Sequence, residues 1–477
     1  MNANSVSPIP NYEYFLELLE AHDQSHLLHF YSELSVTEQK ELLAELNEQD
    51  WDTLGQLIER YGKAYTAAVD HYDISPAPYY PSEPSAELEA KYKEAIKVGK
   101  SLIAAGQVAA FTVAGGQGSR LGWEAPKGTF PATPIREKPL FQVFAEQLKK
   151  AENDFGKAIP WYIMTSPMND ADTRSFFKDH QYFGLDAKNI MFFPQGTLPS
   201  FSKEGKVLLR EKAHLALNPD GHGGSFKALK KSGAIQDMKR RGVEYISYCQ
   251  VDNPHVKIMD PLFIGLHALD GADMSAKMLP KAHAKEKVGN FCLIGGKLGI
   301  IEYSDMPNEL AEATSDKGEL LYNAGSIAIH MISLAFAESI TDDPESLPYH
   351  RAVKKVPYLE VETGDQVQPK EPNAIKLERF IFDAIPLAQH AFILETDRVE
   401  EFAPIKNAEG SDSPATSRDL QTERAARWLE HIGHPVPRKA DGGVDAMIEI
   451  SPLTASSSED LKGLELPEIK PGDKVYL

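Results

Sequence analysis

From Gln107 onward, apolar runs alternate with amphipathic helical patterns, and this alternation limits the possible fold more than any other feature. In chain order, the patterns are strand at Gln107–Ala114, helix at Leu140–Ala151, strand at Trp161–Thr165, helix at Thr173–His180, and strands at Ile190–Phe193 and Tyr245–Val251. Strands separated by helices predict an α/β fold with a mainly parallel sheet covered on both faces. Right-handed crossovers place the loops after these strands along one edge, where ligands bind in such sheets.

The regions on either side of this alternation have a different character. Residues 11–70 have helical patterns, with a capping box at Ser35 and Glu38, and the proline-rich stretch Ser75–Ser85 is typical of an extended connector. A second long helix is expected to end at Gly106. We therefore expect a helical N-terminal domain over residues 1–100 and a catalytic domain over residues 101–395.

After Asp260 the pattern becomes partly antiparallel. Val288–Ile294 and Lys297–Tyr303 flank a Gly-Gly turn and predict a hairpin. A further apolar run extends from Asn323 through Ile332, and Ile375–Ala391 has a helix-like pattern interrupted by Pro386. We expect the remaining residues, 396–477, to form a small C-terminal lobe with β structure.

A glycine cluster follows the first strand of the alternating region. Phe111–Lys127 has the sequence FTVAGGQGSRLGWEAPK. Glycine backbone can approach a ligand closely, and N–H groups backed by Arg120 and Lys127 suit a chain of phosphates. Taken alone, however, a glycine cluster of this kind is more often a plain turn after a core strand.

Two common nucleotide-binding motifs do not fit this loop. Leu121 occupies the position of the third glycine in GxGxxG, and Lys127 follows Pro126 rather than the glycine of GxxxxGK[ST]. The one GKS tripeptide, at Gly99, has Glu94 where its first glycine is required. Dehydrogenases and P-loop kinases are therefore disfavoured.

Composition excludes several other classes of protein. The chain has 477 residues and a net charge of −20, which argues against a nucleic-acid-binding protein. No segment approaches the ~20 apolar residues that span a bilayer, and the N-terminal residues lack a secretory pattern. Cys249 and Cys292 are the only cysteines, so a disulfide framework is excluded. We expect a cytoplasmic protein without a membrane partner.

The glycine loop and a series of downstream blocks resemble the sugar-nucleotide pyrophosphorylases, and among these the eukaryotic-type UDP-N-acetylhexosamine pyrophosphorylases. AGGQGSRLG followed by PKG is similar to the family's nucleotide loop. The other similar blocks, all in the family's order, are PWYIMTS (160–166), QYFGL (181–185), FFPQGTLP (192–199), PDGHGGSFKAL (219–229), YCQVDN (248–253), DPLFIG (260–265), EYS (302–304), NAG (323–325) and PIKNA (404–408). The resemblance implies a Rossmann-like, GT-A-like nucleotidyltransferase domain between N- and C-terminal domains.

The resemblance also implies uridylyl transfer, in which a sugar 1-phosphate attacks the α-phosphorus of UTP and pyrophosphate leaves. Its motifs assign catalytic roles at the phosphates to Arg120, Lys127 and Lys406, and a Mg²⁺ ligand to Asp252. The residues that the family pattern gives to substrate binding are Gly115, Gly116 and Gly118 at the phosphates, Gln195, Gly223 and Gly224 at uracil, and Gly289, Glu302 and Asn323 at the sugar.

Each of these residues also has an ordinary structural explanation. An aspartate at a strand end is often a helix cap, and Glu302 alone would be a solvated charge. Pro194 stands where the family usually has glutamine, so only Gln195 is expected to bind the base, and His222 is expected to be a bystander. FPATPIR, at 130–136, differs from the usual segment after PKG.

The favoured activity is a Mg²⁺-dependent UTP:N-acetylglucosamine-1-phosphate uridylyltransferase. The same reaction with glucose or galactose 1-phosphate, or a broad sugar range, stays open, because one hydroxyl or acetamido group is a local difference in a pocket. A non-catalytic nucleotide-sugar-binding protein is the alternative from another class, and retention of Arg120 and Lys127 weighs against it. The sequence leaves the oligomeric state open, a monomer included.

Overall fold

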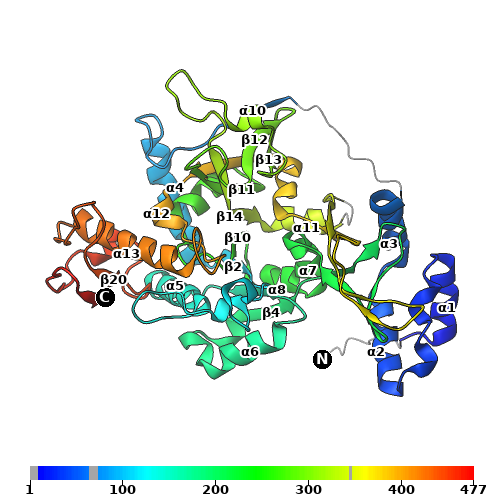
Figure 1. The fold of residues 1–477 in the computed structure, drawn as a ribbon. Helices are drawn as coiled ribbons and strands as arrows, with labels where there is room; N and C mark the ends of the chain where they lie inside the picture. Colours follow the sequence, from blue (N-terminus) through cyan, green and yellow to red (C-terminus); the bar gives the residue numbers. More distant parts are fainter. Residues whose placement is uncertain (1–8, 64–72, 343–345) are drawn as a thin grey trace. The chain divides into compact units, whose positions relative to one another are not determined.

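A computed structural model of the chain describes residues 9–63, 73–342 and 346–477 (Figure 1). The chain forms two compact units. The first, here called the helical unit, comprises Met1–His71, Gly196–Gly224 and Pro348–Phe380, and the second, the sheet unit, comprises Tyr72–Gln195, Ser225–Leu347 and Ile381–Leu477. These bounds differ from the predicted segments 1–100, 101–395 and 396–477, which stay a prediction.

The helical unit packs short helices against a small sheet. Its helices are α1 (Tyr12–Ala21), α2 (Val36–Asn47) and α3 (Trp51–Ile58), and its three-stranded antiparallel sheet has the order β15 (His350–Lys354), β18 (Ala374–Glu378), β6 (Phe201–Ser202). The predicted capping box is confirmed, since Ser35 Oγ accepts from Glu38 N and Glu38 Oε2 accepts from Ser35 N. Of the predicted helical region 11–70, residues 64–70 lie outside the described residues.

The sheet unit is built around a ten-stranded mixed sheet. Its main path runs β1 (Ile74–Pro76), β12 (Asn290–Ile294), β14 (Ala324–Ser333), β10 (Tyr245–Gln250), β2 (Val108–Val113), β3 (Trp161–Thr165), β4 (Ile190–Pro194), with β11 (Met274–Pro280), β13 (Lys297–Ile301) and β19 (Ala391–Glu395) joined to it. β10, β2, β3 and β4 are mutually parallel, which confirms the predicted α/β class.

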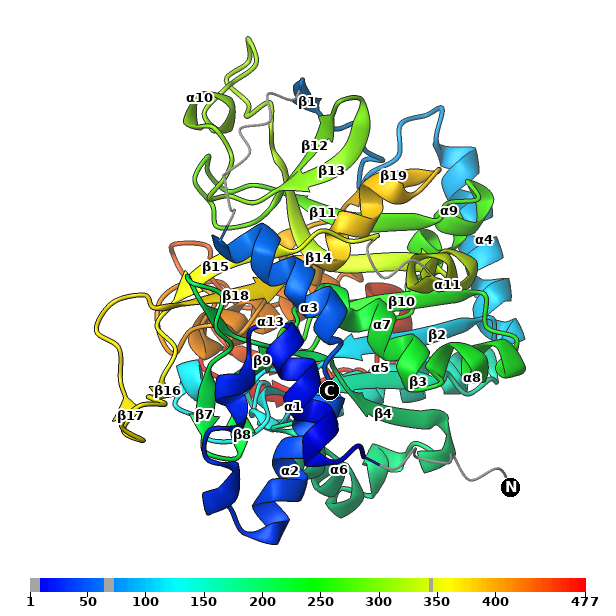
Figure 2. The ribbon, with the colours of Figure 1, turned by 90° about the vertical axis from the view of Figure 1, so that its right-hand side faces the viewer.

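Helices cover both faces of this sheet because side chains along β2 alternate between two buried clusters. Val108 and Ala110 belong to the cluster that includes α4 (Glu89–Ala105), α5 (Leu140–Phe155), α6 (Asp170–Asp179) and α9 (Pro261–Leu269). Ala109 and Phe111 belong to the cluster that includes α7 (Ser225–Lys231), α8 (Ala234–Arg241) and α11 (Leu334–Asp342). Figure 2 shows α7, α8 and α11 in front of the parallel strands.

Helix α4 lies very close to α9. A Cβ added to Gly99 would overlap the backbone of Pro261, and one added to Gly265 would overlap the backbone of Ala95. The helix ends at Gly106, whose φ of 75° is left-handed, as predicted. Gly99 of the GKS tripeptide therefore serves helix packing, and the boundary predicted after residue 100 falls inside α4.

The prediction of a helix over Ile375–Ala391 is wrong. That stretch contains all but the first residue of β18, a 3₁₀ helix (Ile381–Leu387) and the first residue of β19. Ile375 and Leu377 are buried while Lys376 and Glu378 are only partly so, which is the two-residue period of a strand. Pro386 has no N–H to donate in a helix.

The remaining predicted elements have clear counterparts. The predicted hairpin is β12 and β13, with left-handed φ angles of 57° and 81° at Gly295 and Gly296. The C-terminal region packs α13 (Pro414–His431) over a parallel pair, β20 (Met447–Glu449) and β21 (Lys474–Tyr476), around a core of its own. Both cysteines are buried and free. Among the described residues, no helix has the length and apolarity needed to cross a membrane.

Candidate active site

The glycine loop leaves the carboxyl end of β2 and is held by a buried asparagine. Asn169 Nδ2 donates to the carbonyl oxygens of Ala114 (3.0 Å) and Gly116 (3.3 Å), and its Oδ1 accepts from Ser166 N (2.8 Å). The Asn169 side chain thus ties the loop after β2 to the turn after β3. Since Asn169 is fully buried, these bonds have no competition from water.

Backbone hydrogen bonds fold the rest of the loop back on itself. Gly118 N donates to Ala125 O (3.0 Å), and Lys127 N donates to Gly116 O (3.1 Å). A Cβ at Gly118 would lie 2.7 Å from Trp123 Cβ, so only glycine fits there. Arg120 is exposed in a short 3₁₀ helix, Ser119–Leu121, and forms no ion pair with any described residue. The loop therefore presents a guanidinium to solvent that no carboxylate of the described residues neutralises.

Lys127 and Asp252 lie together at the carboxyl ends of β2 and β10. Lys127 Nζ is 3.7 Å from Asp252 Oδ2, and their side chains are 16% and 13% exposed. Because β2 and β10 are neighbouring parallel strands, the segments that follow them meet at one edge of the sheet. The structure thus brings two predicted site residues, 125 positions apart in the chain, into one ion pair.

The segment that carries Lys406 is fastened to the same strand end. Ile405 N donates to Asp252 O (2.9 Å). Asn253 Nδ2 donates to Glu401 O (2.6 Å), and Asn253 Oδ1 accepts from Ala403 N (3.0 Å). The amine of Lys406 is 3.8 Å from Asp412 Oδ2. The backbone of Lys406 is therefore next to Asp252, while its amine is paired with a different carboxylate.

The two halves of the predicted uracil site lie in different compact units. Gln195 N donates to Thr165 O (2.8 Å), and a Cβ on Gly115 would be 3.0 Å from Gln195 Oε1, so this amide lies on the glycine loop. In the helical unit, Gly223 N donates to Arg379 O (2.8 Å), and a Cβ on Gly224 would overlap the carboxylate of Asp220. That Gln195, Gly223 and Gly224 share one base stays a prediction.

The predicted sugar residues belong to the antiparallel part of the sheet unit. Gly289 O accepts from Ser326 N (2.8 Å), and a Cβ on Gly289 would be 2.7 Å from Ile300 Cγ2 and 3.5 Å from Glu302 Oε1. The structure therefore brings Gly289 and Glu302 together. Asn323 immediately precedes β14, and its carbonyl accepts from Lys281 N (2.9 Å).

The donor set around Asp252 fits Mg²⁺ only in a shared site. The described residues contain no group of three or more His, Cys, Asp or Glu that would enclose a metal ion. Mg²⁺ commonly keeps several waters and binds through one or two carboxylates together with phosphate oxygens. Asp252 fits as the single carboxylate of such a site.

Several structural residues of this region were not predicted. Asn169 and Asn253 are buried and tether loops, and Lys277 Nζ lies 2.6 Å from both Asp260 Oδ2 and Glu401 Oε1. Burial alone would lower the pKa of Lys277, but Asp260 and Glu401 together raise it. The sequence did contain one signal for this ion pair. Lys277 is a lone lysine inside the apolar strand MSAKMLP, and a charge in such a strand needs a buried partner.

Known proteins are similar to this chain over nearly its whole length. Residues 53–416 match the family described as UTP–glucose-1-phosphate uridylyltransferase. UDP-N-acetylglucosamine pyrophosphorylase of Saccharomyces cerevisiae is 38% identical over 455 residues, covering 92% of this chain and 94% of the yeast protein. UDP-N-acetylhexosamine pyrophosphorylase-like protein 1 of Homo sapiens is 36% identical over 474 residues, covering 93% of each chain.

The fold has a close counterpart among solved structures. The crystal structure of the uridine diphosphate N-acetylglucosamine pyrophosphorylase from Trypanosoma brucei, in complex with an inhibitor, gives a TM-score of 0.78 at 27% identity. The match covers 96% of this chain and 95% of that chain. With a family match over more than half of its length and relatives above 30% identity over nearly all of it, this protein belongs to the UTP–glucose-1-phosphate uridylyltransferase family of UDP-sugar pyrophosphorylases.

Proposed function

We propose that this protein transfers the uridylyl group of UTP to N-acetylglucosamine 1-phosphate, forming UDP-N-acetylglucosamine and pyrophosphate. The observation that carries the proposal is the pairing of Lys127 with Asp252 at 3.7 Å beside the glycine loop. A cation and a carboxylate at adjacent strand ends suit a polyphosphate and its counter-ion. The names of the yeast and human relatives support the choice of sugar.

The reaction depends mainly on alignment of the two substrates and on stabilisation of the charge that develops on the phosphate oxygens. A phosphate oxygen of the sugar 1-phosphate bonds to the α-phosphorus of UTP, and the bond from that phosphorus to the oxygen bridging the α- and β-phosphates breaks. The attacking oxygen is already anionic, so no general base is required. Lys127 offsets the charge that grows on the α-phosphate oxygens, and Arg120 binds the departing pyrophosphate with its planar guanidinium.

Several groups around this pair have supporting roles. The N–H of Gly118 is already donated to Ala125 O, so Gly118 shapes the loop, and the neighbouring backbone of Gly115 and Gly116 faces the phosphates. Lys406 reaches the phosphates if its amine leaves Asp412. Mg²⁺ bound by Asp252 would supply further neutralisation of phosphate oxygens.

Recognition of the two organic groups is assigned to separate parts of the chain. Gln195, beside the glycine loop, pairs with the edge of uracil. Glu302, beside Gly289, accepts hydrogen bonds from sugar hydroxyls, and Asn323 contributes an amide. We further propose a cytoplasmic location, which the two free cysteines support.

The test is an assay of pyrophosphate release with UTP, Mg²⁺ and a panel of sugar 1-phosphates. We expect kcat/KM for N-acetylglucosamine 1-phosphate to exceed that for glucose or galactose 1-phosphate at least tenfold. A ratio of roughly this size is the discrimination that one well-placed substrate group in a pocket provides. Equal kcat/KM values for all sugars would contradict the assignment of N-acetylglucosamine 1-phosphate as the preferred substrate. The assignment of uridylyltransferase activity would still stand. Absence of release with every sugar, with UTP still bound in calorimetry, would favour the non-catalytic binding protein.

A further inference from the structure

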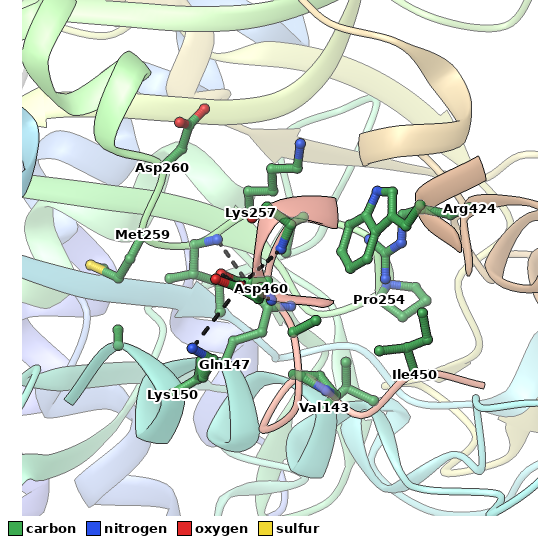
Figure 3. A pocket seen from close by; sticks show the side chains of 18 of the residues that line it. Val143, Gln147, Lys150, Pro254, Lys257, Met259, Asp260, Arg424, Ile450 and Asp460 are labelled. Atoms are coloured by element: carbon green, nitrogen blue, oxygen red, sulfur yellow. Dashed lines mark hydrogen bonds and ion pairs between the residues drawn. The ribbon is translucent and has the colours of Figure 1, made fainter. Parts of the chain in front are cut away.

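One cavity in the sheet unit contains none of the residues predicted to bind substrates. Its volume is about 610 Å³, within the range of pockets that hold small molecules. Its walls come from α5, the segment 254–261 that follows the active-site strand β10, helix α13, and residues 449–460 (Figure 3). Figure 3 shows Arg424, Pro254 and Ile450 on one side and Lys150 and Asp460 on the other.

Most of the acidic groups in these walls already have partners. Asp260 is 2.6 Å from Lys277 Nζ, and Asp154 is 2.7 Å from Lys150 Nζ. Asp460 accepts hydrogen bonds from Ser456 N (2.8 Å) and Ser457 N (3.2 Å). Glu449 Oε2 accepts from Ile135 N (2.7 Å) and Arg136 N (2.8 Å), while its Oε1 is buried without a hydrogen-bond partner among the described residues. Apart from that oxygen, these carboxylates are committed to the protein's own donors.

Arg424 is different, because no carboxylate of the described residues is within ion-pair distance of it, and the more distant charges of Glu400 and Glu401 only partly oppose the effect of burial on its pKa. Its Nη1 donates to two backbone carbonyls, His255 O and Glu400 O, both at a long 3.3 Å, and it forms no ion pair with any described residue. Burial lowers the pKa of Arg424 to about 10, so the guanidinium still carries its charge at neutral pH. A desolvated cation with two weak neutral acceptors has capacity to bind an anion.

Part of the surroundings of Arg424 is apolar. Its guanidinium carbon lies 5.1 Å from the ring centre of Trp428, whose indole N–H is donated to Glu400. Val143, Val256 and Ile450 also line the cavity. A ligand that fills this space therefore needs an apolar body as well as a negative group.

We infer that this cavity binds a small organic anion, a carboxylate or phosphate carried on an apolar or aromatic body, with Arg424 as its counter-charge. Arg424 binds the anionic group, and Trp428 with the aliphatic side chains packs against the body. The site is separate from the proposed substrate site and does not depend on it.

Binding of an anion at Arg424 would also affect the active site, because hydrogen bonds connect the residues that Arg424 contacts to Asp252. The carbonyls that Arg424 contacts belong to His255 and Glu400, and Asn253 bonds to Glu401 O and Ala403 N. Ile405 N in turn bonds to Asp252 O. An anion that draws Arg424 away from these carbonyls therefore loosens the segment that carries Lys406, a consequence that rests on the proposed function.

The experiment uses 8-anilinonaphthalene-1-sulfonate, an aromatic body with one sulfonate, titrated by fluorescence against the full chain. Excess UTP and Mg²⁺ are present throughout to occupy the substrate site. We expect Arg424→Gln to raise the Kd at least tenfold, the cost of a charge-assisted hydrogen bond. The matched control is Arg427→Gln, one turn along the same helix, where the arginine is exposed and paired with Asp397; its Kd should change less than twofold.

A second variant guards against misfolding of Arg424→Gln. Ile450→Trp fills the cavity without changing its charge and should weaken binding of the probe to the same degree. Equal affinity of the wild-type chain and both cavity variants, each with an unchanged melting temperature, would overturn the site.

A rate measurement at saturating UTP tests the consequence for the active site. The probe at ten times its Kd should change pyrophosphate release at least twofold in the wild-type chain and not in Arg424→Gln. Tight binding that depends on Arg424, with no change in rate, would contradict the effect of the cavity on the active site. The existence of the binding site would still be supported. Loss of all activity in every sample would instead contradict the proposed function, while the binding result stands alone.

Discussion

Two lysines of the sheet unit, Lys127 and Lys277, occupy opposite electrostatic situations. Lys277 is fully buried, and its amine lies 2.6 Å from each of two carboxylates, Asp260 and Glu401. Lys127 is 16% exposed at the strand-end edge of the sheet, and its one carboxylate partner among the described residues, Asp252, is 3.7 Å away. One charge is fully satisfied by the protein, whereas the other keeps capacity for a further anion.

The difference distinguishes a structural charge from a functional one. A buried ion whose partners are all protein groups fixes the chain around it, here the start of α9 and the segment before Phe402, and its removal leaves two carboxylates unpaired. A cation at the edge of a parallel sheet with an incomplete set of partners lies where ligands bind. Substitution of each lysine tests this contrast.

The largest effect is expected from Lys277→Met. Removing one member of a buried ion pair costs about 3–5 kcal/mol of the free energy of unfolding, because Asp260 and Glu401 stay buried without their cation. Urea unfolding measures this loss, with Lys178→Met, an exposed lysine on α6, as the control. A loss below about 1 kcal/mol would contradict the structural role of the cluster.

The pH dependence of this loss has a definite sign. Burial would raise the pKa of Asp260, but Lys277 and Lys257 lower it overall. The carboxyl therefore stabilises the folded wild-type chain above its unfolded pKa, near 4, and this stabilisation fades as pH falls through the lower folded pKa. The difference in stability between wild type and Lys277→Met should narrow below about pH 4.

Lys127→Met should show the reverse pattern. We expect kcat to fall about 10²- to 10³-fold, as on removal of one group that stabilises transition-state charge, with less than about 1 kcal/mol lost in unfolding. Pyrophosphate release and urea unfolding measure the two quantities, and Lys178→Met again serves as the control. Near wild-type turnover would show that Lys127 is not the functional cation.

Asn169→Ala tests the support beneath the glycine loop. The change leaves the carbonyl of Ala114 and the N–H of Ser166 without their partner, which costs about 1–3 kcal/mol of stability. Gly116 O loses one of its two donors and still accepts from Lys127 N. Because the loop then moves more freely, KM for UTP should rise. Asn169→Asp retains the acceptor for Ser166 N and loses both donors, so it separates the two contributions; an unchanged KM in both variants would show that the loop holds its own shape.

The smallest effect is expected on the sugar side. Glu302→Gln preserves the shape of the side chain and removes its charge, so KM for the sugar 1-phosphate should rise about tenfold, the scale of one hydrogen bond to a charged group. KM for UTP is the internal control and should stay within twofold. A rise in KM for UTP alone would indicate that Glu302 contacts the nucleotide and not the sugar.

Strands, helices and their order were predictable from sequence because period and turn chemistry are local properties. The parallel strands, the Gly-Gly hairpin and the Ser35 capping box followed from them, as did the meeting of the segments after β2 and β10. Ile375–Ala391 was mistaken for helix because its short alternating run only becomes a strand by pairing with β15. Asn169 and Lys277 were not predicted because their roles depend on partners that only the fold brings near.

The contact of α4 with α9 through Gly99 and Gly265 sets a limit on how this protein can be dissected. Backbone meets backbone there, so no side chain separates the two helices and none can be introduced without displacing one of them. A shortened chain that starts at the glycine-loop strand would uncover the groove on α9 and the apolar residues that α4 buries. The compact unit that carries the central sheet therefore begins upstream of α4.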